Sequence, residues 1–165
     1  MAETFTYAYQ QETRTDVRVA RIFNTFGPRM HENDGRVVSN FIIQAINGAD
    51  ITIYGTGAQT RSFQYVHDLV DGLMALMNQN YTQPVNLGNP DEYSIKEFAS
   101  FIKGKVNSKT SKIVNLPATT DDPQQRRPDI TVAKKHLDWE PRFSVAQGIL
   151  ETIQYFKRRL SENDL

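Results

Sequence analysis

Arginine and histidine side chains in loops marked by glycine and proline are the groups of this 165-residue sequence that could bind an anion. They are Arg29, His31 and Arg36 around one loop, Arg61 beside the start of a strand, and Arg126 and Arg127 before Pro128-Asp129. A guanidinium group can make two parallel hydrogen bonds to a phosphate or carboxylate, so these positions are candidates for such contacts. For any one of them taken alone, a solvated surface side chain is the commoner alternative.

Motifs for other kinds of catalysis are missing from the sequence. It has no cysteine and three scattered histidines, which argues against a thiol nucleophile, a disulfide or a metal site. It has no nucleophile elbow and no P-loop, and none of its seven tyrosines is followed by a lysine four residues later. Residues 55–60, Gly-Thr-Gly-Ala-Gln-Thr, begin like a dinucleotide-binding fingerprint, but the third glycine is a threonine and a strand follows. A turn is therefore the better interpretation.

The composition argues against two classes of partner. Nineteen Lys and Arg balance nineteen Asp and Glu, so the sequence lacks the basic excess that binds nucleic acid or an anionic membrane. No apolar run approaches the ~20 residues that span a bilayer, and the N-terminus lacks the layout of a signal peptide. We expect a soluble chain with no nucleic-acid partner, no membrane segment, and one region over 1–165 with no internal boundary.

Short strands alternate with helices and must position these side chains. Apolar spacing and turn signals predict helices over 2–12, 37–46, 68–77, 95–102, 130–137 and 144–160, and strands over 16–23, 51–54, 62–66, 84–87 and 112–116. Asp68 is predicted to cap its helix, and Ser94 with Glu97 forms a predicted capping box. Residues 118–128 are predicted to form a binding loop, and residues 161–165 a frayed tail. The pattern is α/β, with few and short strands for a complete doubly wound domain.

Longer segments of the sequence carry a resemblance. Residues 21–29, Arg-Ile-Phe-Asn-Thr-Phe-Gly-Pro-Arg, resemble the Arg-x-x-Asn-x-(Tyr/Phe)-Gly-Pro segment of extended short-chain dehydrogenases that act on nucleotide sugars. Residues 30–31, 34–41, 57–66, 85–90, 121–130 and 137–141 look more specifically like the UDP-glucuronate decarboxylase family, also called UDP-xylose synthases. The similarity covers essentially all 165 residues. It implies late Rossmann strands plus the small substrate-binding domain of such an enzyme, without the first βαβ half.

The activity of this family is implied by the resemblance. Its members bind NAD, oxidise C4 of UDP-glucuronate, release CO2 from the resulting keto acid, and return the hydride to give UDP-xylose. They are typically homodimers. Animal members are anchored in the Golgi, which is the localisation expected here, whereas a parent protein without an anchor would be cytoplasmic.

The resemblance also implies that the catalytic groups are absent from this chain. In the family, a Tyr-x-x-x-Lys pair directly precedes the segment that matches Met1-Ala2-Glu3-Thr4, and a glycine-rich NAD-binding unit lies further upstream. We therefore expect no catalytic residue in the chain and no activity from the chain alone. The alternative is a non-catalytic truncated form that binds nucleotide sugar or modulates full-length subunits.

Family positions that approach NAD match Thr25, His31 and Arg36. Positions that contact UDP-glucuronate match Tyr9, Gln11, Glu12, Asn24, Arg61 and Arg126. The resemblance assigns Arg61 to the pyrophosphate and Arg126 to phosphate or the sugar carboxylate. Separately, Asn80-Tyr81-Thr82 is a glycosylation sequon, which makes Asn80 a candidate site of modification.

Overall fold

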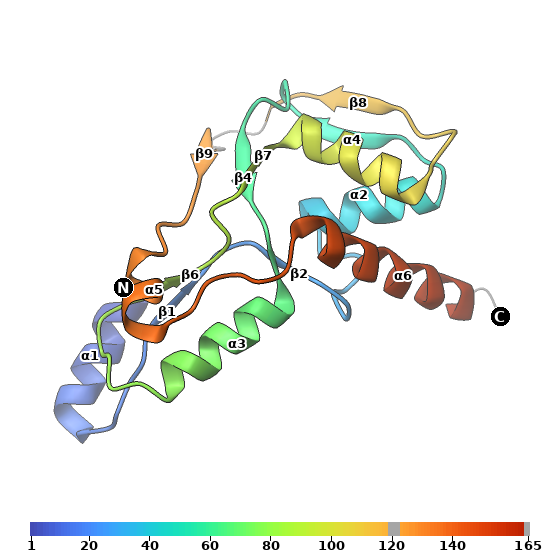
Figure 1. Ribbon diagram of the computed structural model, residues 1–165. Helices are drawn as coiled ribbons and strands as arrows, with labels where there is room; N and C mark the ends of the chain where they lie inside the picture. The colour runs from blue at the N-terminus through green and yellow to red at the C-terminus, as the bar shows by residue number, and fades with distance from the viewer. Residues whose placement is uncertain (119–122, 164–165) are drawn as a thin grey trace.

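The computed structural model describes residues 1–118 and 123–163 (Figure 1). Its helices are α1 (Ala2–Thr13), α2 (Val37–Ile46), α3 (Val66–Met77), α4 (Ile95–Val106), α5 (Thr131–Leu137) and α6 (Val145–Asn163). Its strands are β1 (Ala20–Ile22), β2 (Thr25–Phe26), β3 (Ile51–Tyr54), β4 (Thr60–Ser62), β5 (Gln64–Tyr65), β6 (Val85–Leu87), β7 (Glu92–Ser94), β8 (Ile113–Leu116) and β9 (Gln125–Arg126). The fold is therefore α/β, as predicted. Asp121 and Asp122, which belong to the resemblance, lie outside the described residues.

The larger core lies among α2, α4, α6 and strand β3, which pairs in parallel with β8. Apolar residues recur at one face of α2, and the same spacing brings α6 into this core. Buried members from these two helices are Val38, Phe41, Ile42, Ala45, Val145, Ile149, Ile153 and Phe156. This core makes the upper part of the molecule in Figure 1.

The smaller core joins α3 and α5 to strand β6, which pairs in parallel with β1. Trp139 closes it, and the indole nitrogen of Trp139 donates to the backbone carbonyl of Asp68 at 3.0 Å. Gly72 of α3 lies so close to Trp139 and Leu87 that an added methyl group would come within 3.0 Å of each side chain. The glycine thus allows α3 to pack tightly on this core.

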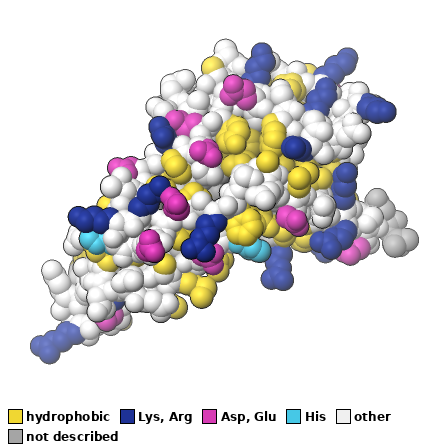
Figure 2. Space-filling view, in the orientation of Figure 1, with side chains coloured by type: hydrophobic (Ala, Val, Ile, Leu, Met, Phe, Trp, Pro, Cys, Tyr) yellow, Lys and Arg dark blue, Asp and Glu magenta, His cyan; other side chains and the backbone are white. Residues whose placement is uncertain are grey.

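Strand β4 pairs with the C-terminal part of the chain, and β5 pairs with the N-terminal part. Strand β4 pairs antiparallel with β7 and parallel with β9, while β5 pairs in parallel with β2. Figure 2 shows basic and acidic side chains interspersed over one face, with hydrophobic side chains gathered over α4. The balanced net charge therefore does not arise from two large patches of opposite sign on that face.

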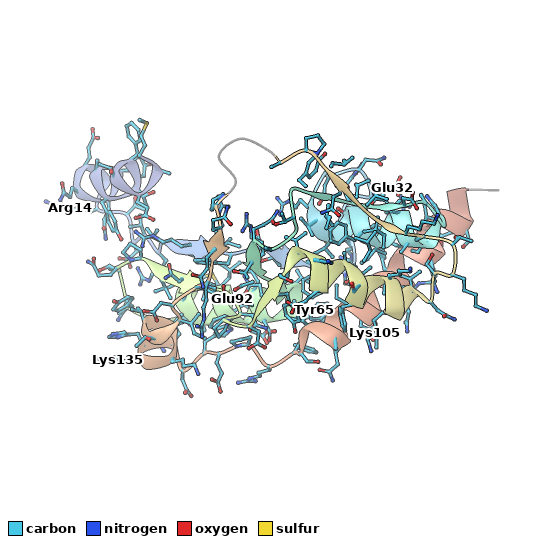
Figure 3. The ribbon with its side chains drawn as sticks, turned by 90° about the horizontal axis from the view of Figure 1, so that it is seen from above. Arg14, Glu32, Tyr65, Glu92, Lys105 and Lys135 are labelled. Carbon is cyan, nitrogen blue, oxygen red and sulfur yellow. The ribbon has the colours of Figure 1, made fainter. Side chains whose placement is uncertain are left out.

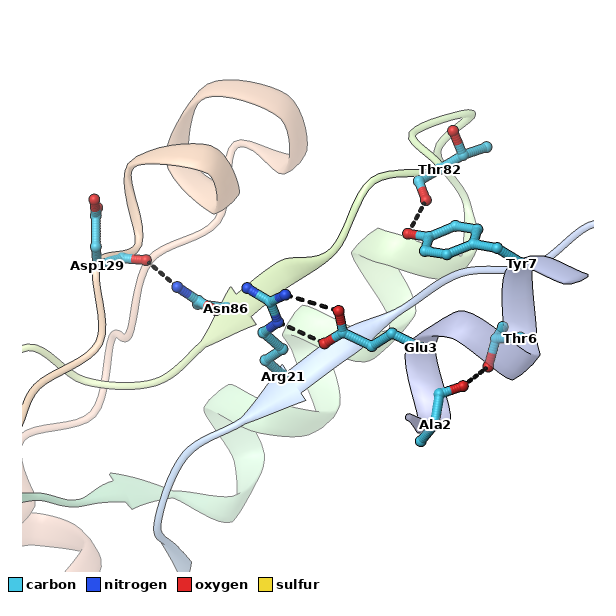
Figure 4. A network of polar contacts seen from close by, with 8 residues as sticks. All are labelled: Ala2, Glu3, Thr6, Tyr7, Arg21, Thr82, Asn86 and Asp129. Atoms are coloured by element: carbon cyan, nitrogen blue, oxygen red, sulfur yellow. Dashed lines mark hydrogen bonds and ion pairs between the residues drawn. The ribbon is translucent and has the colours of Figure 1, made fainter.

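Helix α1 lies apart from the rest of the molecule, which is clearest from above (Figure 3). None of residues 2–13 is buried. Glu3 accepts two hydrogen bonds from the Arg21 guanidinium, at 2.6 and 2.7 Å, and the Tyr7 hydroxyl donates to the carbonyl of Thr82 at 2.8 Å (Figure 4). Polar contacts thus hold α1 to β1 and to the turn before β6.

Several predicted boundaries are wrong because the strands are very short and pair with segments far away in the sequence. The strand predicted over 62–66 is two strands interrupted at Phe63, and α3 begins at Val66 with Tyr65 as its N-cap. The strand predicted over 16–23 is limited to Ala20–Ile22, the length over which it pairs with β6. Strands β2, β7 and β9 were not predicted, and β9 lies within the predicted binding loop.

Helix caps give one confirmed and one wrong prediction. The capping box of α4 is confirmed, since Glu97 donates its backbone N–H to the Ser94 hydroxyl and its carboxylate accepts from the Ser94 backbone. Asp68 does not cap α3, because its carboxylate is turned toward the backbone of Arg142 and Phe143. The predicted frayed tail is also wrong as far as Asn163, where α6 ends; residues 164–165 are not described.

Candidate functional site

Two adjoining pockets form a cleft at the ends of β1 and β4. They have volumes of about 590 and 270 Å³ and share three lining residues, Asn24, Thr25 and Arg36. The larger pocket is also lined by Arg21, Ile22, Phe23 and Arg126, and the smaller by Met30, Gly35, Val37, Val38, Arg61 and Phe63. We call this the arginine cleft. It brings together five of the predicted ligand contacts: Asn24, Thr25, Arg36, Arg61 and Arg126.

Arg61 and Arg126 both line the cleft, Arg61 in the smaller pocket and Arg126 in the larger. They are register partners on the parallel strands β4 and β9, so their backbones are about 4.8 Å apart and their side chains leave the same face. Arg61 is 8% exposed, and its guanidinium donates to the carbonyl of Thr60 at 2.7 Å, whereas Arg126 is exposed. Guanidinium groups on neighbouring strands can each donate hydrogen bonds to a phosphate or carboxylate.

Glu92 on β7 holds Gln125, the residue before Arg126, across the intervening strand β4. Its carboxylate accepts hydrogen bonds from the Gln125 amide at 2.9 and 3.0 Å and from the Thr60 hydroxyl at 2.8 Å. The bond from Gln125, followed by that from Thr60, holds the pKa of Glu92 below its ordinary value. A carboxylate on β7 thus ties β9 to β4 and places Arg126 next to Arg61.

Arg36 enters the cleft from the loop before α2. Asp34 accepts a hydrogen bond from the backbone N–H of Arg36 at 3.0 Å and lies 3.8 Å from its guanidinium. The Ser39 hydroxyl donates to the same carboxylate. Gly35, which lies between Asp34 and Arg36, has φ +73°, a conformation that favours glycine. The tight turn therefore presents the Arg36 side chain at the cleft while Asp34 partly balances its charge.

Asn24 and Thr25 lie where β1 ends and β2 begins. The Asn24 amide donates to the carbonyl of Ser62 at 3.3 Å. The Thr25 hydroxyl donates to the carbonyl of Phe23 at 2.9 Å and accepts from the Gln64 amide at 3.0 Å. Because its hydrogen is already used, Thr25 can offer a ligand only its methyl group or the remaining lone pair.

Arg21 also lines the cleft, but its charge is balanced. The bidentate contact with Glu3 comes from α1, and the hydrogen bond from Arg21 is the main cause that lowers the pKa of Glu3 below its ordinary value. Arg36, Arg61 and Arg126 are the other guanidinium groups that line the cleft.

Four predicted contacts lie outside the cleft. His31 is exposed in the preceding loop, where its Nδ1 accepts from the backbone of Asn33 at 3.1 Å. Tyr9 and Glu12 line a separate pocket on the face of α1 opposite Glu3, as expected for 100° per residue, and Gln11 is exposed on the same helix. The structure does not bring these four residues to the arginine cleft, and their roles stay predictions.

Metal binding and membrane crossing have no candidate among residues 1–118 and 123–163. No group of three or more His, Asp or Glu side chains is arranged there to hold a metal ion, and no helix there is long and apolar enough to cross a bilayer.

Sequence reasoning missed Gln64, Arg21 and Asp34, which contact the cleft residues. The signals for Gln64 were a polar residue between Phe63 and Tyr65 and its place in the family-like segment 57–66. Arg21 was visible only as part of a family motif, and Asp34 as part of a polar turn.

The chain matches the family described as GDP-mannose 4,6 dehydratase over residues 1–152. It is 60% identical over 160 residues to UDP-glucuronic acid decarboxylase 1 of Danio rerio, covering 97% of this chain and 38% of that protein. It is 48% identical over 163 residues to UDP-glucuronic acid decarboxylase 1 of Arabidopsis thaliana, covering 99% of this chain and 37% of that protein. The chain thus spans less than two-fifths of the length of these relatives.

Solved structures share the fold. UDP-glucose 4-epimerase of Thermotoga maritima, solved with UDP-glucose, has a TM-score of 0.90 at 25% identity, over 96% of this chain and 51% of that chain. UDP-glucuronic acid 4-epimerase of Bacillus cereus, solved with UDP-glucuronic acid and NAD, has a TM-score of 0.86 at 24% identity, over 95% of this chain and 50% of that chain. The second likeness shows the fold alone.

Proposed function

The chain belongs to the GDP-mannose 4,6 dehydratase family, and from this we propose that it is the C-terminal, nucleotide-sugar-binding part of an NAD-dependent UDP-glucuronic acid decarboxylase. Relatives with that name are 60% and 48% identical over nearly the whole chain. The proposed reaction of the longer enzyme converts UDP-glucuronate into UDP-xylose and CO2.

The arginine cleft is the observation that carries the proposal. Arg61 and Arg126 are register partners at one wall of the cleft, and Arg36 lies at another. A pyrophosphate carries charged oxygens that can engage two guanidinium groups at once. We assign the pyrophosphate of the nucleotide sugar to Arg61, a phosphate or the sugar carboxylate to Arg126, and the sugar side to Asn24.

The cleft residues fit NAD in part. Thr25 and Arg36 line the cleft and would face the cofactor from the substrate side, whereas His31 lies outside. NAD, when bound, accepts a hydride from the sugar and returns it. The residues of this chain bind and orient the nucleotide sugar. Such orientation lowers the activation barrier of the reaction although this chain supplies no acid–base group.

Isothermal titration of the chain with UDP and with UDP-glucuronate tests the proposal. Arg61→Ala and Arg126→Ala should each weaken UDP binding roughly tenfold or more, because a hydrogen bond to a charged group contributes about 1.5–3 kcal/mol. Arg158→Ala removes an exposed arginine of α6 and serves as the matched control, with no expected effect. Equal UDP affinity of all three variants and the wild type would contradict the proposal.

A non-catalytic role of the chain is the second candidate function. The sequence contains no Tyr-x-x-x-Lys pair, so we expect no CO2 release from UDP-glucuronate by the chain alone. Adding the chain to a full-length family enzyme tests modulation, because the family is typically homodimeric and mixed dimers would change the rate. A rate that is independent of added chain would exclude this role.

The proposal also includes glycosylation of Asn80 and localisation of the longer enzyme in the Golgi lumen. Asn80 is exposed in the turn between α3 and β6, where its side-chain oxygen lies 3.4 Å from the Arg18 guanidinium. An exposed sequon on a turn is accessible to the glycosylation machinery. The test expresses the longer protein through the secretory pathway and measures its mass with and without glycosidase. For a Golgi-lumenal enzyme we expect a glycosidase-sensitive mass shift in the wild type and its loss in Asn80→Gln.

A further inference from the structure

Gln64 is a polar side chain buried where the two cores meet. Its side chain is 1% exposed, and its chain neighbours Phe63 and Tyr65 both belong to the larger core. Its amide nitrogen reaches the carbonyl of Leu87 in the smaller core at 2.9 Å. Burying an amide costs free energy unless hydrogen bonds replace those with water, so its partners matter.

The Gln64 amide joins strand β6 to two segments that line the cleft. It donates to Leu87, the last residue of β6, and to the Thr25 hydroxyl on β2 at 3.0 Å. It also lies 3.4 Å from the carbonyl of Phe23, directly after β1. The orientation of the amide is fixed, because the flipped form would set its oxygen against these acceptors.

Two of the joined segments, around Phe23 and Thr25, carry cleft residues. Ligands bind at the carboxyl ends of parallel strands, and β1 and β6 form such a pair. Thr25 lines both pockets, and the carbonyl of Asn24 accepts from the backbone N–H of Gln64 at 2.9 Å. Gln64 therefore holds Asn24 and Thr25 on one side and continues through Phe63 to Arg61 on the other.

We propose that Gln64 is a positioning residue of the nucleotide-sugar cleft, whose buried amide sets Asn24 and Thr25 relative to Arg61. The inference rests on the proposed function, because that function gives the cleft its ligand.

Positioning and stability are separable at this site. The carbonyl of Leu87 also accepts from the backbone of Phe23 at 3.1 Å, and the carbonyl of Phe23 accepts from Thr25 at 2.9 Å, so both keep a donor without Gln64. Within the described part of the chain, Gln64 Oε1 is buried without a hydrogen-bond partner. Gln64→Leu removes this unpaired acceptor, which offsets the lost bonds. We expect the variant to fold with little change in Tm.

Gln64→Glu supplies a readout that a structural role alone would not give. Burial and the surrounding carbonyl oxygens favour the protonated carboxyl, which donates one hydrogen bond in place of the amide, whereas the carboxylate donates none. UDP affinity is measured for the wild type and each variant at acidic and at basic pH. Dividing the UDP affinity of the variant by that of the wild type at the same pH cancels the effect of the titration of UDP itself.

We expect Gln64→Leu to bind UDP about tenfold more weakly at both pH values, and Gln64→Glu to be close to wild type at acidic pH and about tenfold weaker at basic pH. A Gln64→Leu affinity equal to wild type, or a Gln64→Glu ratio that does not change with pH, would overturn the inference.

Failure of the proposed function has a different signature. If neither wild type nor Arg61→Ala binds UDP, the proposed function fails for this chain, and Gln64 is judged by amide hydrogen exchange of residues 23–25 and 85–88. Protection in Gln64→Glu, relative to wild type, should then fall at basic pH only. Unchanged protection at both pH values would overturn the positioning role.

Discussion

The carboxylate of Asp68 anchors the segment that leads into α6. It is 2% exposed and accepts from the backbone N–H groups of Arg142 at 2.8 Å and Phe143 at 3.2 Å. Asp68→Ala leaves both N–H groups without this acceptor, and we expect it to lower the free energy of unfolding by about 1–3 kcal/mol in urea denaturation. Asp68→Asn keeps one acceptor oxygen and should lose less. Equal losses in the two variants would contradict the anchoring role.

The same residue gives a pH dependence with a defined sign. Burial is the main cause that raises the pKa of Asp68 above its ordinary value, opposed by the two backbone hydrogen bonds. Between the ordinary pKa and the raised pKa the folded chain binds more protons than the unfolded chain, so stability falls as pH rises there. We expect Tm of wild type to fall relative to Asp68→Asn across that window. Glu162→Gln, an exposed change on α6, should show no such trend.

Residue types in the cleft were predictable, but their partners were not. Arg61 and Arg126 are 65 positions apart and meet only because β9 pairs with β4. No local pattern indicates a strand of two residues, so the adjacency of the two cations could not be inferred. The prediction for Asp68 was wrong for a similar reason, because the backbone N–H groups that donate to its carboxylate lie more than 70 residues further along the chain.

At the level of elements, α4 is specified by its cap. Ser94 and Glu97 bond reciprocally, and the helix then packs on α2, β3 and α6. We expect Ser94→Ala to lower the free energy of unfolding by about 0.5–2 kcal/mol, measured in urea. Ser100→Ala, which removes an exposed hydroxyl from the middle of the same helix, is the control and should be nearly neutral. If both variants unfold alike, the cap does not stabilise the helix.

Elements with strong local signals were predicted well. Helix α2 and strand β3 follow the predicted bounds, because Asn47-Gly48 and Gly55 end them with turn geometry. The strands of two or three residues were missed, since their pairing depends on distant partners. Ser144 and Gln147 make a second reciprocal cap, at the start of α6, whose Ser-x-x-Gln signal was present in the sequence.

At the scale of the whole molecule, α3 exposes an apolar stripe. Val70, Leu73, Met74 and Met77 lie at helical spacing and are 38–69% exposed. Exposed apolar side chains that share one face favour association in water. We expect the chain to self-associate with rising concentration in light scattering after gel filtration. Leu73→Glu with Met77→Glu should increase the monomer fraction, whereas Leu150→Glu on α6 should not. A wild type that is monomeric at every concentration would contradict this.

Helix α1 is attached through Glu3 and Tyr7, and none of residues 2–13 is buried. Segments with little buried apolar area open at a small free-energy cost while the cores stay folded. Glu3 shields Arg21 only while α1 is closed, so each opening uncovers a further positive charge at the wall of the cleft. The electrostatic potential at this wall of the cleft therefore depends on the contact between Glu3 of α1 and Arg21.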